Sequence, residues 1–149
     1  MNYKRNITIV FMLLAVIISL SILSCRTLAG QPEIKKVEVI PNEIYPGDTA
    51  VIQAVVKDKH HIVQKVEGIV KEDPRIKLRL RDDGIEPDKK ANDGIWILKV
   101  DVPNEVMPGE FMLEITAYRK DGLPIKVRHK EEKIVTLKKE IPIVIKSKN

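Results

Sequence analysis

Six oxygen-bearing side chains gather in one twelve-residue stretch, and their types and spacing suggest metal binding. They are Asp82, Asp83, Glu86, Asp88, Asn92 and Asp93. Calcium takes six to eight oxygen ligands, so the stretch predicts a calcium site whose ligands are all of these residues except Glu86. The spacing is not that of an EF-hand loop, and Lys89 and Lys90 in the middle of the stretch oppose a cation.

A structural interpretation of the same stretch competes with calcium binding. Asp82, Asp88 and Asp93 are suited to accept hydrogen bonds from nearby backbone N–H groups and so to form Asx turns. Gly84 and Gly94 supply the left-handed backbone conformation that tight turns require. The sequence favours this structural role, and calcium binding is the alternative.

The remaining residues exclude the commonest nucleophilic enzymes. Cys25 is the only cysteine, and Ser147 is the only serine that follows it. A serine or cysteine hydrolase is therefore excluded, and the sequence predicts a protein that is not an enzyme. His60 and His61 are candidates for a copper or zinc site, but adjacent strand residues point to opposite faces, which favours a solvated loop.

Apolar residues alternate with polar ones along most of the chain, as is typical of half-buried strands. The predicted strands are residues 34–40, 49–56, 62–70, 76–81, 96–102, 111–117, 134–137 and 141–145. Proline, glycine, asparagine and aspartate separate them, and no segment shows a helical apolar stripe. Seven or eight short strands predict an all-β fold, an immunoglobulin-like two-sheet sandwich, with Trp96 at the centre of its core.

The acidic stretch also resembles part of a known kind of domain. The motif D-D-G at 82–84, then Asp88, then N-D-G before Ile95-Trp96, resembles a loop in immunoglobulin-like domains of bacterial exported proteins, including the choice-of-anchor domains. Residues 109–122 look like the next strand pair of these domains. The resemblance covers roughly residues 34–144 and implies the sandwich fold without implying a reaction.

The N-terminal residues have the pattern of an export signal. Lys4 and Arg5 precede an apolar run that closes on Ile22-Leu23-Ser24-Cys25. These four residues resemble the lipobox of bacterial lipoproteins, which implies cleavage between Ser24 and Cys25 and a lipid on the sulfur of Cys25. An uncleaved membrane anchor is the alternative, because about 20 apolar residues span a bilayer.

Cleavage would divide the chain into a signal peptide at 1–24, a lipidated cysteine with a short tether at 25–33, and one domain at 34–149. After cleavage the chain carries 24 basic and 21 acidic residues, a net charge of +3. The lipid would hold the domain outside the cytoplasm, on the cell membrane or the outer membrane, where nucleic acid is not a partner. Arg26 favours the outer membrane, since the resemblance to enterobacterial lipoproteins implies that an aspartate there retains them at the inner membrane.

The sequence thus predicts a lipid-anchored, non-enzymatic, extracytoplasmic module that acts in protein interaction or envelope structure. Its predicted partners are the membrane, through the lipid on Cys25, and an envelope protein that the sequence does not identify. The predicted contact surfaces are an edge strand or the loops at one end of the sandwich. The alternative is a lipoprotein that binds calcium or a small ligand through residues 82–94.

Overall fold

The computed structural model describes residues 30–129 and 133–147, which form strands and turns and no helix. The predicted signal peptide at 1–24, the cleavage site at Ser24 and Cys25, and most of the tether lie outside these residues. All the described strands belong to one compact unit, Pro32–Asn149. Nowhere in the described ranges is there a helix long and apolar enough to cross a membrane.

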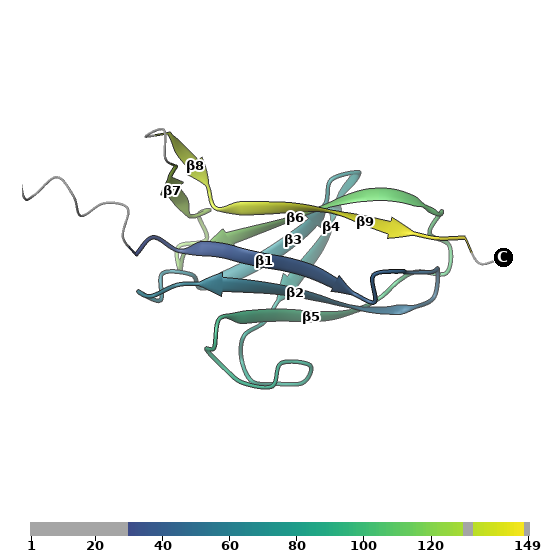
Figure 1. The fold of residues 1–149 in the computed structure, drawn as a ribbon, viewed down its shortest axis with the longest axis horizontal. Coiled ribbons are helices and arrows are strands. Elements are labelled where there is room, and N and C mark those ends of the chain that lie inside the picture. Colours follow the sequence, from purple (N-terminus) through teal and green to yellow (C-terminus); the bar gives the residue numbers. More distant parts are fainter. Residues whose placement is uncertain (1–29, 130–132, 148–149) are drawn as a thin grey trace, which may run out of the picture. The chain divides into compact units, whose positions relative to one another are not determined.

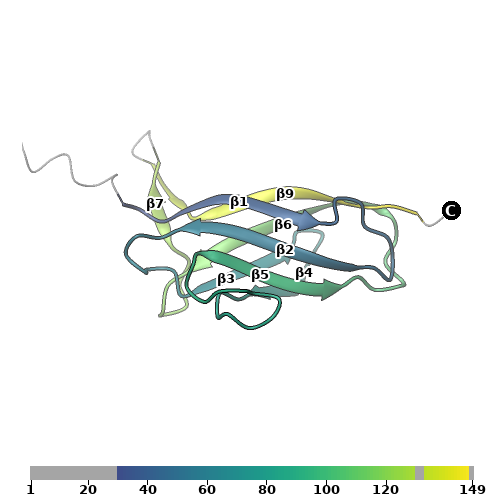
Figure 2. The same ribbon diagram turned by 60° about the horizontal axis from the view of Figure 1, so that its bottom comes forward.

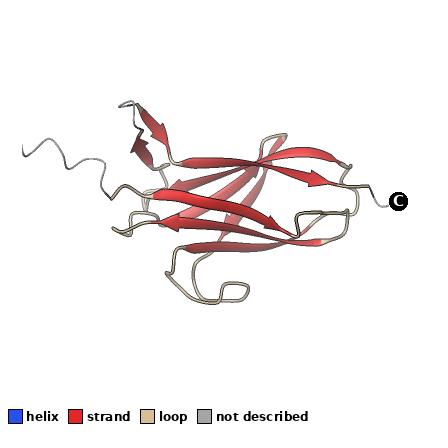
Figure 3. Cartoon of the chain, viewed as in Figure 1, coloured by secondary structure: helices blue, strands red, loops and turns tan. Residues whose placement is uncertain are grey.

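Seven of the described strands form two antiparallel sheets that pack face to face (Figures 1 and 3). One sheet has the order β1 (Glu33–Ile40), β2 (Thr49–Lys57) and β5 (Ile95–Asp101). The other has the order β4 (Asp73–Leu80), β3 (Lys65–Val70), β6 (Gly109–Tyr118) and β9 (Lys138–Ile145). Two short strands, β7 (Lys126–Arg128) and β8 (Ile134–Thr136), pair as a separate hairpin. The predicted all-β two-sheet sandwich is confirmed.

The strands differ from the sequence prediction in several places. β4 and β9 each begin three residues earlier than predicted, at Asp73 and Lys138. The described chain has nine strands, and the one that the sequence analysis does not predict is β7, whose three residues are too few to show a period. β3 begins at Lys65 and not at Ile62. The cause is Asp58, whose carboxylate accepts a hydrogen bond from the backbone N–H of Val63 at 2.6 Å and holds the preceding residues in a loop.

The core lies between the two sheets, where alternate residues of each strand point inward. In β2 the buried residues are Ala50, Ile52, Ala54 and Val56, and the residues between them are half-buried. The largest fully buried side chains are Leu80, Leu113, Ile115 and Val66. Trp96, predicted as the centre of the core, is only partly buried, so that prediction is wrong. The indole lies near the start of the edge strand β5 and lines an open groove there.

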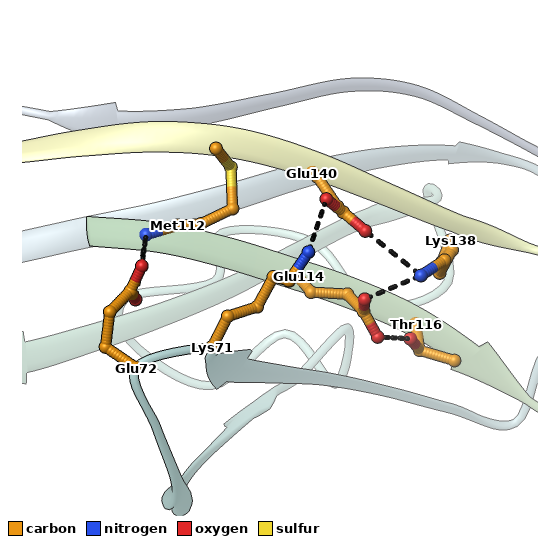
Figure 4. A network of polar contacts seen from close by, with 7 residues as sticks. All are labelled: Lys71, Glu72, Met112, Glu114, Thr116, Lys138 and Glu140. Atoms are coloured by element: carbon orange, nitrogen blue, oxygen red, sulfur yellow. Dashed lines mark hydrogen bonds and ion pairs between the residues drawn. The ribbon is translucent and has the colours of Figure 1, made fainter. Parts of the chain in front are cut away.

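A network of charges joins strands on the solvent face of the four-stranded sheet (Figure 4). The ammonium groups of Lys71 and Lys138 each donate to the carboxylate of Glu140 at 3.0 Å, and Lys138 also donates to Glu114 at 2.7 Å. The carboxylate of Glu72 accepts the backbone N–H of Met112, 3.0 Å away. The turn between β3 and β4 is thereby tied to β6 and β9.

Glu140 is expected to make the stability of the domain depend on pH. Lys138 and Lys71 lower the pKa of the Glu140 carboxyl from 4.5 to about 2. A carboxyl with a depressed folded-state pKa contributes stability above its unfolded pKa and loses it as pH falls toward the folded value. We therefore expect wild type to melt above Glu140→Gln at neutral pH, with the gap closing between pH 4.5 and pH 2. Melting curves across this range test it, and a constant gap would contradict it.

Candidate functional site

Residues 81–94 form a long acidic loop that leaves the end of β4 and returns to β5 (Figure 2). Its neck is closed by the backbones of Arg81 and Ile97, which exchange two N–H···O bonds of 2.9 and 2.8 Å. Because β4 and β5 are edge strands of different sheets, these two bonds also join the sheets. The loop is therefore built on the framework of the sandwich at a point where both sheets meet.

Asp82 connects the beginning of this loop to its end. Its carboxylate accepts the backbone N–H groups of Asp93 at 3.2 Å and Gly94 at 3.0 Å. Its own carbonyl oxygen accepts the N–H of Asn92 at 3.4 Å. Asn92 and Gly94 both have positive φ, 58° and 84°, which turns the chain back toward Asp82.

Asp88 organises the middle of the loop from a buried position. Its carboxylate accepts the backbone N–H of Gly84 at 2.6 Å through one oxygen and that of Lys90 at 3.1 Å through the other. Asp83 and Asp93 are arranged in a similar way, each accepting the N–H of the residue two positions ahead at 3.0 and 2.9 Å. The predicted capping of backbone N–H groups by aspartates is thereby confirmed.

The two inner carboxyls of the loop have opposite pKa shifts. Burial raises the pKa of Asp82, the N–H groups that it accepts oppose this, and the charge of Asp93 adds to the rise. The N–H of Gly84 is the main cause that lowers the pKa of Asp88. Of these two carboxyls, Asp82 is therefore the one whose negative charge the loop compensates less well.

Three of the predicted ligands converge. Carboxylate oxygens of Asp82, Asp88 and Asp93 lie within 4.8 Å of one another, an arrangement that could hold a metal ion. Asp83 is outside this group, and its carboxylate lies 3.5 Å from the guanidinium of Arg81. Glu86 is outside it too, whereas Asn92 lines the groove beside the loop.

A groove of about 910 Å³ separates the acidic loop from the loop that joins β2 to β3. Residues of both charges line the groove. The basic ones are Lys57, Lys59, Lys65, Arg79 and Arg81, and the acidic ones are Asp58, Asp82, Asp83 and Asp93. Its lining includes His61 but no serine, threonine or cysteine. The groove thus offers ionic groups for binding and no hydroxyl or thiol nucleophile.

This groove is not predictable from the sequence. Its two walls are loops some twenty residues apart in the chain, and they face each other only because β2 pairs with β5 and β3 pairs with β4. Alternation of apolar residues carries no information on which strands pair. His60 and His61, weighed as a metal site, lie exposed in the loop between β2 and β3, where only His61 lines the groove. Neither belongs to the acidic group.

No model of a protein family matches the chain, and no curated protein matches it either. The function is therefore inferred from the residues of the chain and their geometry.

Proposed function

We propose that the chain is a lipid-anchored, non-enzymatic module outside the cytoplasm that binds another protein of the cell envelope. The apolar run that closes on Ser24-Cys25 supports the lipid anchor. The immunoglobulin-like sandwich and a groove without a hydroxyl or thiol nucleophile support a binding role. The observation that carries this role is the open edge of β4.

β4 is an outer strand of the four-stranded sheet, and much of it is in contact with solvent. Residues 74–77 are exposed, including Ile76 at 45%. Within the described residues, β5 is bonded to this side of the sheet only at Arg81, one position beyond the end of β4. An edge of this kind offers backbone N–H and C=O groups to which another strand can be added.

Two other sheet edges are partly covered. β9 contains Pro142 in its interior, whereas the proline of β4, Pro74, is only the second residue of that strand. The N–H of Lys146 beyond the end of β9 is bonded to the carbonyl of Ile44 at 2.8 Å. On β1 the carbonyl of Lys35 accepts the ammonium of Lys139 at 2.7 Å. β4 is therefore better suited than β9 or β1 to accept a strand of a partner.

The side chains of β4 indicate the chemistry of that partner. Lys77 and Arg79 are exposed on the outer face, whereas the guanidinium of Arg75 is already paired with Asp73 at 2.8 Å. Cross-strand neighbours of opposite charge and apolar neighbours both stabilise strand pairing. The partner strand should therefore present acidic residues beside Lys77 and Arg79 and an apolar residue beside Ile76.

Site-specific crosslinking in intact cells tests the binding edge. A photoreactive residue in place of Lys77 should give one discrete adduct, because its side chain lies beside the added strand. The same residue in place of Lys99, an exposed lysine on the edge strand β5, should give none. Ile76→Glu should abolish the adduct while leaving the melting temperature nearly unchanged. No adduct at position 77, or equal adducts at both positions, would contradict the proposal.

The lipid anchor makes a separate prediction about the N-terminus. The mature protein from a bacterial host should begin at Cys25, with a diacylglyceryl group on its sulfur. Cys25→Ala should retain residues 1–24 and incorporate no labelled fatty acid, while still cosedimenting with membranes through the retained apolar run. Mass spectrometry of the N-terminal peptide decides between the two forms. A wild-type chain that begins at Met1 with a free thiol would rule out the anchor.

Calcium binding by the acidic loop is the second candidate, and the convergence of Asp82, Asp88 and Asp93 favours it. Saturating calcium should then raise the melting temperature of wild type by mass action. Asp93→Asn should remove this rise. Asp121→Asn should retain it, because Asp121 also caps a turn, through the N–H of Leu123 at 3.1 Å, but lies outside the acidic group. No binding heat and an unchanged wild-type melting temperature would exclude a calcium site.

A further inference from the structure

The two ends of the sandwich carry different charge. β1 begins at the same end as the β7–β8 hairpin, as Figure 1 shows, and there Glu33 pairs with Lys57 at the end of β2. Among the described residues of 119–137, which contain this hairpin and the turn before it, five are basic and one is acidic. At the other end, loops 41–48 and 102–108 contain three acidic residues and no basic ones. The acidic loop 81–94 also leaves from the end at which β1 begins, since Val55 pairs with Ile95, so the basic charge of that end is concentrated in the hairpin segment.

The β7–β8 hairpin has one face toward the domain and one toward solvent. Its cross-strand pairs are Lys126 with Thr136, Val127 with Val135, and Arg128 with Ile134. Val127 and Val135 are half-buried, and Val127 packs against the core. Because successive side chains alternate, the opposite face carries Lys126, Arg128 and Ile134, all exposed, with Ile134 at 64%. This basic-apolar face has two cations on β7 and one large apolar side chain on β8, directly opposite Arg128.

The base of the hairpin is fixed to the sandwich. Ile125 and Leu137 are buried, and the N–H of Leu137 donates to the carbonyl of Ile125 at 2.7 Å. Ala117 of β6 accepts the N–H of Ile125 at 2.9 Å and donates its own N–H to Leu137 at 3.1 Å. The basic-apolar face is thus held in place by the fold before any partner binds, which lowers the entropic cost of binding.

A second apolar side chain projects nearby. Leu123 is 55% exposed in the turn that precedes the hairpin, where Lys120 lies and where Arg119 is paired with Asp121 at 2.9 Å. The turn is closed by the backbone N–H of Arg119, which donates to the carbonyl of Leu123 at 3.0 Å. Cations around projecting apolar side chains are the composition expected of a surface that lies in the headgroup region of an anionic bilayer.

We propose that the basic-apolar face and the turn 119–125 dock on the anionic headgroups of the membrane that holds Cys25. This inference rests on the lipid anchor of the proposed function. The eight residues from Cys25 to Pro32 reach at most about 26 Å, so the end of the domain at which β1 begins stays close to the bilayer. Figures 1 and 2 both draw the acidic loop on the opposite side of the sandwich from the hairpin, away from the docked face.

Tryptophan fluorescence of the full lipid-anchored chain tests the docking. The chain is reconstituted in vesicles of phosphatidylcholine with and without phosphatidylglycerol, and brominated lipids serve as the quencher. Ile134→Trp should give an additional blue-shifted emission that the brominated lipids quench in anionic vesicles. Met107→Trp should give an additional emission that they do not quench, because Met107 is 79% exposed in loop 102–108 at the acidic end. The unsubstituted chain gives the baseline from Trp96.

Charge reversal separates docking from simple proximity to the membrane. Lys126→Glu in the Ile134→Trp chain should lower the equilibrium constant between the docked and undocked orientations by about fivefold or more. This is the effect expected from the loss of one basic residue near an anionic surface. Equal quenching of the tryptophans at positions 134 and 107 would overturn the docking. Quenching at position 134 that changes neither with the phosphatidylglycerol content nor with Lys126→Glu would overturn it as well. Flotation with the vesicles, measured on the same samples, reports the lipid anchor. A chain that does not float would overturn anchor and docking together, whereas flotation with equal quenching would overturn the docking alone.

Discussion

Replacing Gly94 with alanine is expected to destabilise the domain by at least about 2 kcal/mol. Gly94 has φ of +84°, and the left-handed conformation costs a residue with a Cβ about 1–2 kcal/mol. A Cβ at this position would also lie 2.5 Å from the carbonyl oxygen of Val56, a backbone atom of β2 that cannot move alone. Such crowding adds about 1–3 kcal/mol. Urea denaturation of Gly94→Ala against wild type measures the loss.

Gly122 provides the matched control for this substitution. Its φ is +79°, but an added Cβ would meet no atom within 4 Å. Gly122→Ala should therefore lose only the conformational part, about 1–2 kcal/mol. The difference between the two variants isolates the contact between the acidic loop and β2. Equal losses would show that the loop can move away from Val56, and the predicted cost of crowding at Gly94 would be wrong.

The local conformation of the acidic loop was predictable from residue types, but its packing was not. Aspartates that cap turns and glycines with positive φ follow from the D-D-G and N-D-G motifs alone, and the structure has both at Gly84 and Gly94. The close approach of Gly94 to Val56 depends on how β2 pairs with β5. Pairing and register are set by contacts across the whole sandwich, which no short motif contains.

Gly68 illustrates the same limit within a strand. From the sequence, a glycine in β3 reads as a weak point of the strand. In the structure a Cβ at Gly68 would lie 2.8 Å from Cδ1 of Ile115 and 3.2 Å from Cδ1 of Leu113, both on the neighbouring strand β6. The glycine therefore gives two fully buried side chains of the core the space that they occupy. Which side chains fill the space beside Gly68 depends on how β3 pairs with β6, and the sequence of β3 alone does not determine this pairing.

The acidic group shows how far residue spacing can narrow down a site. Six oxygen-bearing residues mark the loop, and the structure brings together the carboxylates of Asp82, Asp88 and Asp93. These three of the six residues come together because the loop folds back on itself, with Asp82 accepting the N–H groups of Asp93 and Gly94. Asp83 follows Asp82 directly, but its carboxylate accepts a hydrogen bond from the N–H of Ile85 and lies outside the acidic group.

β4 shows what alternation predicts about burial and what it leaves open. The pattern places Ile76, Leu78 and Leu80 on one face, and the structure leaves Ile76 45% exposed while Leu80 is 1% exposed. The four-stranded sheet is one strand wider than the three-stranded sheet that faces it. Its outer strand β4 is therefore only partly covered by the three-stranded sheet. Only at the Leu80 end do the Arg81–Ile97 bonds bring β5 over β4. Sheet width and the position of that bridge cannot be derived from one strand.

Because burial increases along β4 from Ile76 to Leu80, truncating these two side chains to alanine should change the free energy of unfolding by very different amounts. Leu80→Ala removes a fully buried side chain and should lower the free energy of unfolding by about 2–5 kcal/mol. Ile76→Ala should lower it by less than about 1 kcal/mol, since nearly half of the Ile76 side chain is already in water. Urea denaturation of both variants at the same pH measures the two losses.

The small stability effect of Ile76→Ala makes it informative about binding. If a partner strand is added at β4, this variant should weaken the adduct formed from position 77 while the domain stays as folded as wild type. Leu80→Ala, in contrast, should weaken the adduct only to the extent that it unfolds the domain. Comparable losses of stability in the two variants would mean that Ile76 is covered in solution. In that case the edge of β4 would not be open, and the binding role proposed for it would have to move to another surface.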